Sequence, residues 1–321
     1  MKEKISLKAK LVRDMIKFST SQHIIGPKIQ NGTLRRKWTE APWHRPEGFL
    51  WMPIRMKKFD MELLTPPQEG CGEVVLQLHG GGYIGKMKNS YRDFAVLYSQ
   101  MPGYRKVLTI DYRVAPEHPY PAALQDALTA YQWLLEVGYQ GEDIILAGDS
   151  AGGGLALALS MYLRDHEMPL PKCMVLMSPW ADLTASGESY TENYENDPLF
   201  GNTKESMIYN GEYVADNDPQ NPYISPMFGD FTGLPPMLFQ TGSIEMLLSD
   251  TITSAQKARE AGCQVQETIY EGMFHVFQAG MLRMPESERA WQEVEAFLNL
   301  YSPQVTEVVE KDESSENQEN E

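Results

Sequence analysis

The strongest chemical signal in the sequence is the pentapeptide Gly148-Asp149-Ser150-Ala151-Gly152, which has the pattern G-x-S-x-G. It follows the apolar run 143–147 and opens a run of small and apolar residues that extends to 164. A serine on a tight turn between a strand and a helix presents its hydroxyl above the sheet, beside the positive end of the helix. The pattern therefore predicts that Ser150 is a nucleophile, with a glycine-rich helix start as the alternative interpretation.

A second signal is the segment His79-Gly80-Gly81-Gly82-Tyr83, which follows the apolar run 73–78. Consecutive glycines leave backbone N–H groups open, and acyl transfer requires such donors where a tetrahedral oxyanion forms. A phosphate-binding turn is the alternative, but the Lys-Ser pair of a P-loop does not follow the glycines. We expect His79 to brace this turn through hydrogen bonds.

A nucleophilic serine needs a base, and His275 is the best candidate among the six histidines. In hydrolases that use the chain order serine, acid, histidine, the base lies near the C-terminus. His275 meets that condition and follows the strand-like run 265–270. We expect His118, like His79, to support a loop, whereas the remaining three histidines are assigned to surface or cap positions.

The acid should lie between Ser150 and His275, after a strand. Glu245 is the first carboxylate after the apolar run 236–240, and Asp250 is the alternative. Asp250 is more consistent with the first turn of the next helix, where a negative charge is favourable. We therefore predict that Glu245 orients His275 and stabilises its imidazolium form.

These candidates are positioned by an alternation of short apolar runs and helical patterns. Short runs rich in Val, Ile and Leu predict strands at 73–78, 105–110, 143–147, 173–177, 236–240 and 265–270. Helical spacing predicts helices at 91–101, 122–137, 150–164, 250–261 and 287–300. This order is typical of a doubly wound α/β protein with a mostly parallel sheet and helices on both faces.

Two segments interrupt the alternation, residues 1–50 and about 181–232. An insertion of the size of the second segment is more consistent with a cap than with an unstructured loop, so we expect a catalytic domain that spans 51–305 and contains this cap, preceded by the N-terminal segment 1–50. Residues Ile5, Val12, Met15 and Ile16 recur at roughly helical spacing among basic residues; a membrane-surface helix is the less favoured interpretation. The acidic tail 306–321 is expected to be disordered.

Charge and cysteine content exclude several classes of function. The net charge of −16 would repel phosphate backbones, so nucleic-acid binding is not expected. The three cysteines are widely spaced, which fits free thiols in a reducing cytoplasm rather than a disulfide framework. We find no signal peptide, no transmembrane span, no metal-ligand pattern and no dinucleotide motif, and therefore expect a cytoplasmic protein without metal or cofactor.

Four segments together resemble the hormone-sensitive-lipase-like branch of the α/β-hydrolases: HGGGY at 79–83, the loop 111–127, GDSAGGG at 148–154 and YEGMFH at 270–275. The resemblance covers about residues 50–300. It implies the α/β-hydrolase fold, Ser150 as nucleophile, His275 as base and Glu245 at a position where many members have Asp. It also implies an oxyanion hole made by the N–H groups of Gly81, Gly82 and Ala151, and a helical cap built from the N-terminal segment 1–50 and the insertion at about 181–232.

The same resemblance assigns supporting roles to His79, Gly80 and Asp149 and makes 111–127 a structural loop that braces the glycine turn. The expected activity is hydrolysis of short-chain acyl esters, so the expected partner is a small-molecule ester. A deacetylase of acetylated sugars or small metabolites, a non-catalytic ligand-binding protein and a peptidase are the alternatives. The oligomeric state is left open, and a homodimer is one possibility that the sequence permits.

Overall fold

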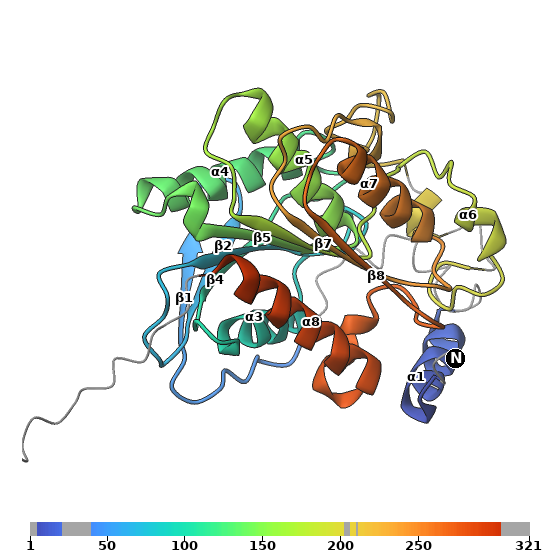
Figure 1. Cartoon of the computed structure of the whole chain (residues 1–321), viewed down its shortest axis with the longest axis horizontal. Helices are drawn as coiled ribbons and strands as arrows, with labels where there is room; N and C mark the ends of the chain where they lie inside the picture. The colour runs from blue at the N-terminus through green and yellow to red at the C-terminus, as the bar shows by residue number, and fades with distance from the viewer. Residues whose placement is uncertain (1–4, 21–39, 202–205, 210, 303–321) are drawn as a thin grey trace, which may run out of the picture.

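The computed structural model describes residues 5–20, 40–201, 206–209 and 211–302, and its centre is an eight-stranded sheet (Figure 1). The strand order is β1-β2-β4-β3-β5-β6-β7-β8. Strand β2 is antiparallel to both β1 and β4, and the other neighbours are parallel. The strands are β1 (Leu50–Arg55), β2 (Asp60–Thr65), β3 (Val74–Leu78), β4 (Lys106–Asp111), β5 (Ile144–Asp149), β6 (Cys173–Met177), β7 (Met237–Gly242) and β8 (Val265–Tyr270).

Helices cover both faces of the sheet, which confirms the predicted fold class. Helices α3 and α8 lie on one face, and α4, α5 and α7 lie on the other (Figure 1). Within the described residues, no helix is long and apolar enough to cross a membrane. The helices are α1 (Leu7–Ser19), α3 (Asn89–Gln100), α4 (Ala122–Glu136), α5 (Ala151–Asp165), α6 (Ser189–Glu192), α7 (Leu248–Glu260) and α8 (Pro285–Tyr301).

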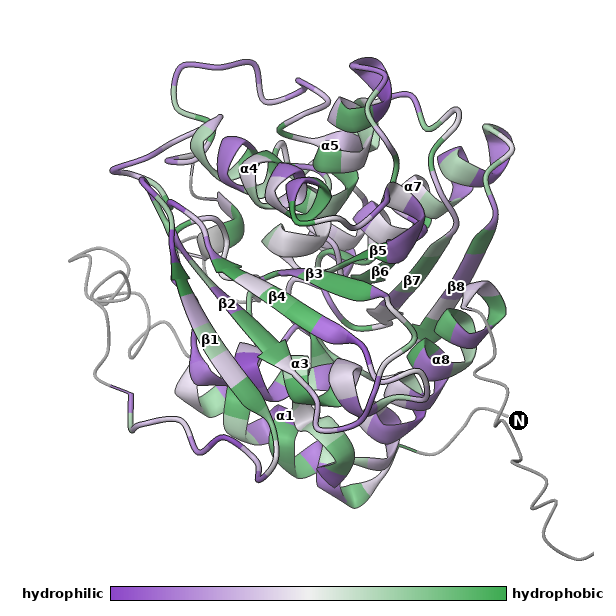
Figure 2. Cartoon of the chain, turned by 90° about the vertical axis from the view of Figure 1, so that its left-hand side faces the viewer, coloured by the Kyte–Doolittle hydropathy of each residue, from purple (hydrophilic) through white to green (hydrophobic). Residues whose placement is uncertain are grey.

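The central strands β3, β5, β6 and β7 are buried at every position and are mostly apolar, because both faces of the sheet are covered there. Val74 and Leu76 of β3 belong to the large cluster shared with α4 and α5, whereas Val75 between them belongs to the cluster under α3 and α8. Successive side chains of a strand point to opposite faces of the sheet. A continuous apolar run therefore contributes side chains to the hydrophobic clusters on both faces. Figure 2 shows the hydrophobic central strands enclosed between the two helical layers.

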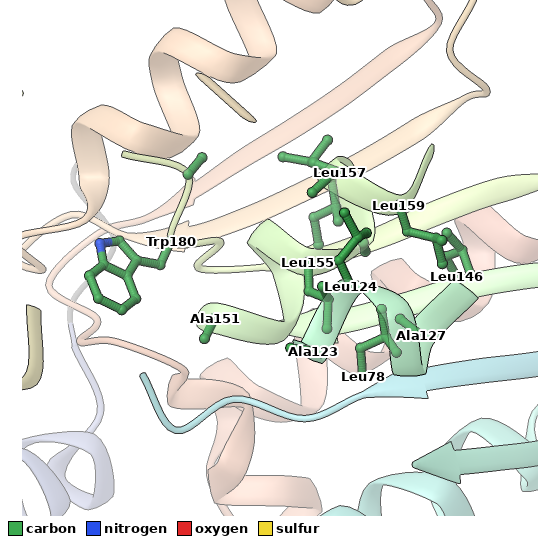
Figure 3. Packing of buried hydrophobic residues seen from close by; sticks show 14 of the residues in the cluster. Leu78, Ala123, Leu124, Ala127, Leu146, Ala151, Leu155, Leu157, Leu159 and Trp180 are labelled. Atoms are coloured by element: carbon green, nitrogen blue, oxygen red, sulfur yellow. The ribbon is translucent and has the colours of Figure 1, made fainter. Parts of the chain in front are cut away.

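Helix α5 is buried along its whole length, because it lies between the sheet and α4. Leu155, Leu157 and Leu159 of α5 pack among Leu124 of α4 and Leu146 of β5 (Figure 3). Twelve of the fifteen residues of α5 are buried, so the Ser150 turn at its start is anchored to the buried core.

Strands β1 and β2 were not among the predicted elements. Together they form an antiparallel hairpin at one edge of the sheet, in which Pro53 lies opposite Glu62. Proline cannot donate a ladder hydrogen bond and is tolerated in edge strands, and β1 is largely exposed. The apolar alternation that marks a half-buried strand is therefore missing from β1.

The N-terminal helix α1 packs against the loop that follows β8. Ala9 is buried with Met273 and Phe274 of this loop, and Ile5, Val12 and Ile16 pack around them. Ser6 caps the helix by accepting a hydrogen bond from the Ala9 N–H, and its own N–H and hydroxyl donate to Glu286. The expectation that Met15 shares the inner face was wrong, because this side chain is 67% exposed.

The insertion at 181–232 contains little helix where it is described. The four-residue α6 and two short 3₁₀ turns, Met207–Tyr209 and Pro226–Phe228, lie among irregular loops, so the expected helical cap is helical mainly through α1. The contacts of Asp182 explain why the insertion has little helix. Its carboxylate accepts hydrogen bonds from the N–H groups of Thr184 and Ser186, and such local contacts favour turns over helix. The tail 306–321 and residues 21–39 of the N-terminal segment lie outside the described residues.

Candidate active site

Ser150 lies on a sharp turn between β5 and α5, at the carboxyl edge of the sheet. Its backbone has φ 54° and ψ −125°, which a non-glycine residue adopts only where its surroundings force it. The Ser150 N–H donates to the Met177 carbonyl at 2.9 Å, and the Ser150 carbonyl accepts from the Trp180 N–H at 2.8 Å. The loop after β6 therefore holds the turn from both sides.

Gly152 explains how close this turn comes to the neighbouring strand. A Cβ atom at Gly152 would lie 2.0 Å from the carbonyl oxygen of Leu78, the last residue of β3. Only glycine permits that approach, which brings the start of α5 beside the glycine turn that follows Leu78. Ala151, the first residue of α5, has one of the N–H groups that a helix start leaves without a helical partner.

The glycine turn 79–85 bends sharply beside Ser150. Gly81 has φ 118° and Gly82 has φ 62°, in the region that favours glycine, and the Gly85 N–H closes the turn by donating to the Gly81 carbonyl at 2.8 Å. The loop 111–127 holds the turn: the Tyr112 hydroxyl donates to the His79 carbonyl at 2.6 Å, and the Ala115 N–H donates to the Tyr83 carbonyl at 2.8 Å.

The loop 111–127 is itself fixed by an ion pair. The guanidinium of Arg113 contacts the buried carboxylate of Asp126 at 2.7 Å, and Asp126 also accepts from the Arg113 N–H at 2.9 Å. Asp111 accepts a hydrogen bond from the Met87 N–H, just after the glycine turn. Arg113, Asp126 and Asp111 thus make contacts that hold the loop in place.

His79 is completely buried behind the glycine turn. Its ring stacks on Tyr112 with centroids 4.0 Å apart, and its Nδ1 atom lies 2.7 Å from the Gly80 carbonyl oxygen. Burial lowers the pKa of His79 to about 4, so the ring is neutral at pH 7. A neutral Nδ1–H can donate to that carbonyl, which is the bracing contact expected from the sequence.

Asp149 connects the Ser150 turn to the glycine turn. Its carboxylate accepts hydrogen bonds from the Gly80 N–H and from the Tyr91 hydroxyl, each at 3.3 Å. Burial raises the pKa of Asp149 to about 7, although the nearby charge of His275 acts in the opposite direction.

His275 and Glu245 form a buried pair. His275 follows β8, Glu245 follows β7, and the Nδ1 atom of the imidazole lies 2.6 Å from Oε2 of the carboxylate. Both side chains are almost fully withdrawn from solvent. Since β5, β7 and β8 are parallel, the loops that carry Ser150, Glu245 and His275 all leave the sheet at the same edge.

The second oxygen of Glu245 is saturated with donors. Oε1 accepts hydrogen bonds from the Gly242 N–H at 2.6 Å, from the Ser178 hydroxyl at 2.9 Å and from the Thr241 hydroxyl. These contacts turn Oε2 toward the imidazole. Ser178 and Thr241 could not be selected from the sequence, because a serine or threonine at a strand end has no motif of its own.

Asp250, the alternative acid, lies at a different place. Its Oδ2 atom accepts hydrogen bonds from the N–H groups of Ala181 and Asp182, at 2.9 and 2.8 Å, and from the Tyr190 hydroxyl at 3.2 Å. Burial, together with the neighbouring Asp182, raises the pKa of Asp250 well above its usual range. Asp250 thus ties α7 to the start of the insertion, while the contact with His275 belongs to Glu245.

The insertion reaches the pair through a short segment after α6. The Asn193 amide donates to the Glu245 carbonyl at 2.9 Å, and Asp197 accepts from the Met246 N–H at 2.7 Å. Phe200 lies against the His275 ring with centroids 4.7 Å apart. These contacts place the insertion directly over the loops of Glu245 and His275.

The sequence makes six aromatic residues candidates to line the entrance of the site, and they do not all lie near Ser150: Trp38, Trp43, Trp51, Trp180, Tyr83 and Phe200. Tyr83 and Trp180 are buried near each other, with ring centroids 6.0 Å apart, and Tyr83 stacks on Tyr213 of the insertion. Trp43 and Trp51 pack together beside β1, which three strands separate from β5, so they lie away from Ser150. Trp38 lies outside the described residues.

The described residues contain no group of three or more His, Cys, Asp or Glu side chains that could hold a metal ion. Among these residues, the pair formed by His275 and Glu245 is therefore not part of a metal-binding group. Its position at the same edge of the sheet as the strained Ser150 is suited to proton transfer and acyl transfer.

Comparison with known proteins agrees with this geometry. A family model described as the alpha/beta hydrolase fold matches residues 75–279. An acetyl-hydrolase of Streptomyces hygroscopicus is 41% identical over 232 residues, which cover 72% of this chain and 77% of the relative. An esterase of Acinetobacter venetianus is 35% identical, covering 76% of this chain and 80% of the relative.

Solved structures give the same result over most of the chain. The crystal structure of an esterase from the bacterial hormone-sensitive lipase family is 31% identical, with a TM-score of 0.80, and the match covers 93% of this chain and 99% of that one. The esterase EstE5, soaked with p-nitrophenyl butyrate, matches at 30% identity with a TM-score of 0.80, over 92% of this chain and 99% of its own. The chain therefore belongs to the hormone-sensitive-lipase-like branch of the α/β-hydrolases and is a carboxylic ester hydrolase.

Proposed function

We propose that the protein is a serine carboxylesterase that cleaves short-chain acyl esters through Ser150, His275 and Glu245. The observation that carries the proposal is the 2.6 Å contact between His275 Nδ1 and Glu245 Oε2. When Nδ1–H donates to the carboxylate, the proton-free nitrogen of the neutral ring is Nε2. That nitrogen is then the base for the Ser150 hydroxyl.

In the acylation step, Ser150 Oγ attacks the acyl carbonyl while His275 takes the hydroxyl proton. The resulting imidazolium is stabilised by the charge of Glu245, which stays ionised. Collapse of the tetrahedral intermediate breaks the ester bond, and His275 gives the proton to the leaving alcohol. In deacylation, His275 activates a water molecule, which releases the acid and regenerates Ser150.

The oxyanion of each tetrahedral intermediate would be bound by the N–H groups of Gly81, Gly82 and Ala151. Support comes from the positive φ values of Gly81 and Gly82 and from the position of Ala151 at the start of α5. Fixed donors of this kind act where charge develops, and removal of one donor typically costs about 100-fold or more in rate.

Two observations favour short acyl groups. A relative is named an acetyl-hydrolase, another is named an ethyl acetate hydrolase from Pseudomonas putida, and the structural relative EstE5 was soaked with a butyrate ester. Bulky aromatic residues also flank the site, because the Trp180 N–H donates to the Ser150 carbonyl and the Phe200 ring lies 4.7 Å from the His275 ring. Deacetylation of small metabolites is the second candidate, favoured by the name of the Streptomyces relative.

The decisive test is hydrolysis of p-nitrophenyl esters from acetate to dodecanoate by the wild type and by Ser150→Ala. We expect the highest kcat/KM for acetate or butyrate and no turnover by the variant, whose thermal unfolding remains cooperative. Wild-type turnover by folded Ser150→Ala would refute the assignment of the nucleophile. A maximum at the long-chain esters would refute the assignment of short-chain substrates, and acetylated saccharides assayed in parallel test the second candidate.

A further inference from the structure

Ser178 occupies a central position among the loops of the site. It follows β6, between the strand that leads to Ser150 and the strand that leads to Glu245. Its N–H donates to the Gln240 carbonyl of β7 at 2.7 Å, and its side chain is completely buried. Its φ of 47° lies in the left-handed region, where a serine is strained.

The Ser178 hydroxyl makes two hydrogen bonds that join separate parts of the site. Its proton is donated to Glu245 Oε1 at 2.9 Å, while its oxygen accepts the Val276 N–H at 3.2 Å. A hydroxyl has one proton and two lone pairs, so it can do both at once. One side chain thus links the carboxylate that faces the imidazole to the backbone of the residue directly after His275.

The other donors to this oxygen cannot provide that link. Thr241 and Gly242 are the last residues of β7, four and three residues before Glu245 in the same stretch of chain, so they do not tie Glu245 to another element. Ser178 comes from β6 and ties that turn to a neighbouring strand. Val276 itself has φ 49°, so the chain after His275 is held in a strained conformation that its hydrogen bond to Ser178 helps to maintain.

We propose that Ser178 is a positioning residue for ester hydrolysis, whose hydroxyl holds the Glu245 carboxylate and the His275 loop in a fixed mutual orientation. The inference rests on the proposed roles of His275 and Glu245. Ser178 acts through those two residues and needs no contact with substrate. Its loss should lower kcat and leave KM nearly unchanged, because the pocket that binds the ester is not altered.

The test compares Ser178→Ala and Ser178→Gly with the matched control Ser99→Ala. Glycine removes both the hydroxyl and the backbone strain, whereas alanine removes only the hydroxyl. Ser99 is equally buried and donates to the Arg105 carbonyl at 2.6 Å, on a helix away from the site. We expect kcat for p-nitrophenyl acetate to fall about tenfold in both Ser178 variants and to stay at the wild-type value in Ser99→Ala.

A second measurement separates positioning from simple structural support. In the wild type, the proton between His275 Nδ1 and Glu245 should give a far-downfield NMR resonance, because the contact is short and charge-assisted. We expect this resonance to shift or broaden in folded Ser178→Gly, which should also be more stable than Ser178→Ala. A purely structural role predicts that Ser178→Gly retains both the resonance and the wild-type kcat, and that result would overturn the proposal.

The outcome can be distinguished from a failure of the proposed function. If Ser150→Ala and Glu245→Gln are inactive but both Ser178 variants turn over normally, the role of Ser178 is refuted and the esterase mechanism stands. If folded Ser150→Ala remains active, the mechanism itself is wrong, whatever the Ser178 variants do.

Discussion

The imidazole of His275 and the carboxylate of Glu245 meet at 2.6 Å although the two residues are 30 positions apart in the chain. The strand β8 and the helix α7 lie between them in sequence, and the parallel pairing of β7 with β8 brings their following loops together. The pair is therefore a product of sheet topology, and its properties can be tested one residue at a time.

Glu245→Gln should inactivate the enzyme, whereas Asp250→Asn should not. Glutamine keeps the shape of the side chain but loses the charge that stabilises the imidazolium, so we expect kcat to fall by about three to four orders of magnitude. Asparagine at 250 retains an oxygen that can accept from the Ala181 and Asp182 N–H groups. Steady-state kinetics of both variants decides between the two acids, and a near-normal kcat for Glu245→Gln would contradict our assignment.

Asp149→Asn should change the pH dependence of stability in a defined direction. The pKa of Asp149 is raised by burial from 3.8 to about 7, so between these values the folded protein holds a proton that the unfolded chain has released. The free energy of unfolding of the wild type therefore falls as pH rises through this window. From pH 5 to pH 8, we expect the wild type to lose about 2–3 kcal/mol relative to Asp149→Asn.

Urea unfolding of both proteins at pH 5, 6.5 and 8 provides the comparison, since all other titrating groups cancel in the difference. Parallel stability curves would show that Asp149 does not titrate in this range. That result would mean that the folded protein already holds the carboxylate ionised at pH 5, and it would contradict the prediction.

His79→Gln should show a slope of opposite sign. Burial lowers the pKa of His79 from 6.5 to about 4, so in this window the unfolded chain binds a proton that the folded protein excludes. The wild type therefore loses stability as pH falls. At pH 7.5 we expect His79→Gln to be less stable than the wild type, because glutamine cannot stack on Tyr112. At pH 5 the difference in the free energy of unfolding between the two proteins should be smaller by about 2 kcal/mol. Thermal unfolding at the two pH values measures this change.

Gly152→Ala should destabilise the fold far more than an ordinary glycine substitution. The added Cβ would lie 2.0 Å from the Leu78 carbonyl oxygen, so α5 and β3 must separate. We expect a loss of about 3 kcal/mol or more in the free energy of unfolding, with a loss of activity. Gly211→Ala is the matched control, because a Cβ there has no neighbour within 4 Å, and it should stay within about 0.5 kcal/mol of the wild type.

Much of the fold could be predicted because the central strands are buried on both faces. Such strands appear as continuous apolar runs, and all six predicted strands are present within about two residues of their expected bounds. Strand β1 was missed because its exposed, proline-containing sequence depends on pairing with β2 rather than on its own pattern. The structure of the insertion at 181–232 was harder to predict. Backbone N–H groups there donate to Asp182 and Asp197, and these contacts stabilise local turns instead of helix.

The site could be predicted where its residues lie in motifs or follow strands in a fixed order. Gly81, Gly82, Ser150 and Ala151 belong to two recognisable turns, and Glu245 and His275 follow strands at the expected edge. Ser178 could not be predicted in the same way. Its importance depends on two hydrogen bonds across 67 and 98 residues of sequence, which only the folded chain brings together.

Four non-glycine residues with left-handed φ values, Tyr83, Ser150, Ser178 and Val276, gather around this one edge of the sheet. Each stores backbone strain that the surrounding core must hold. If the protein were selected for heat resistance alone, substitutions that relieve this strain, chiefly to glycine, would be favoured. Each such gain in stability would loosen the geometry that we propose for turnover. The reserve of stability in the buried sheet and in α5 is what allows the enzyme to keep them strained.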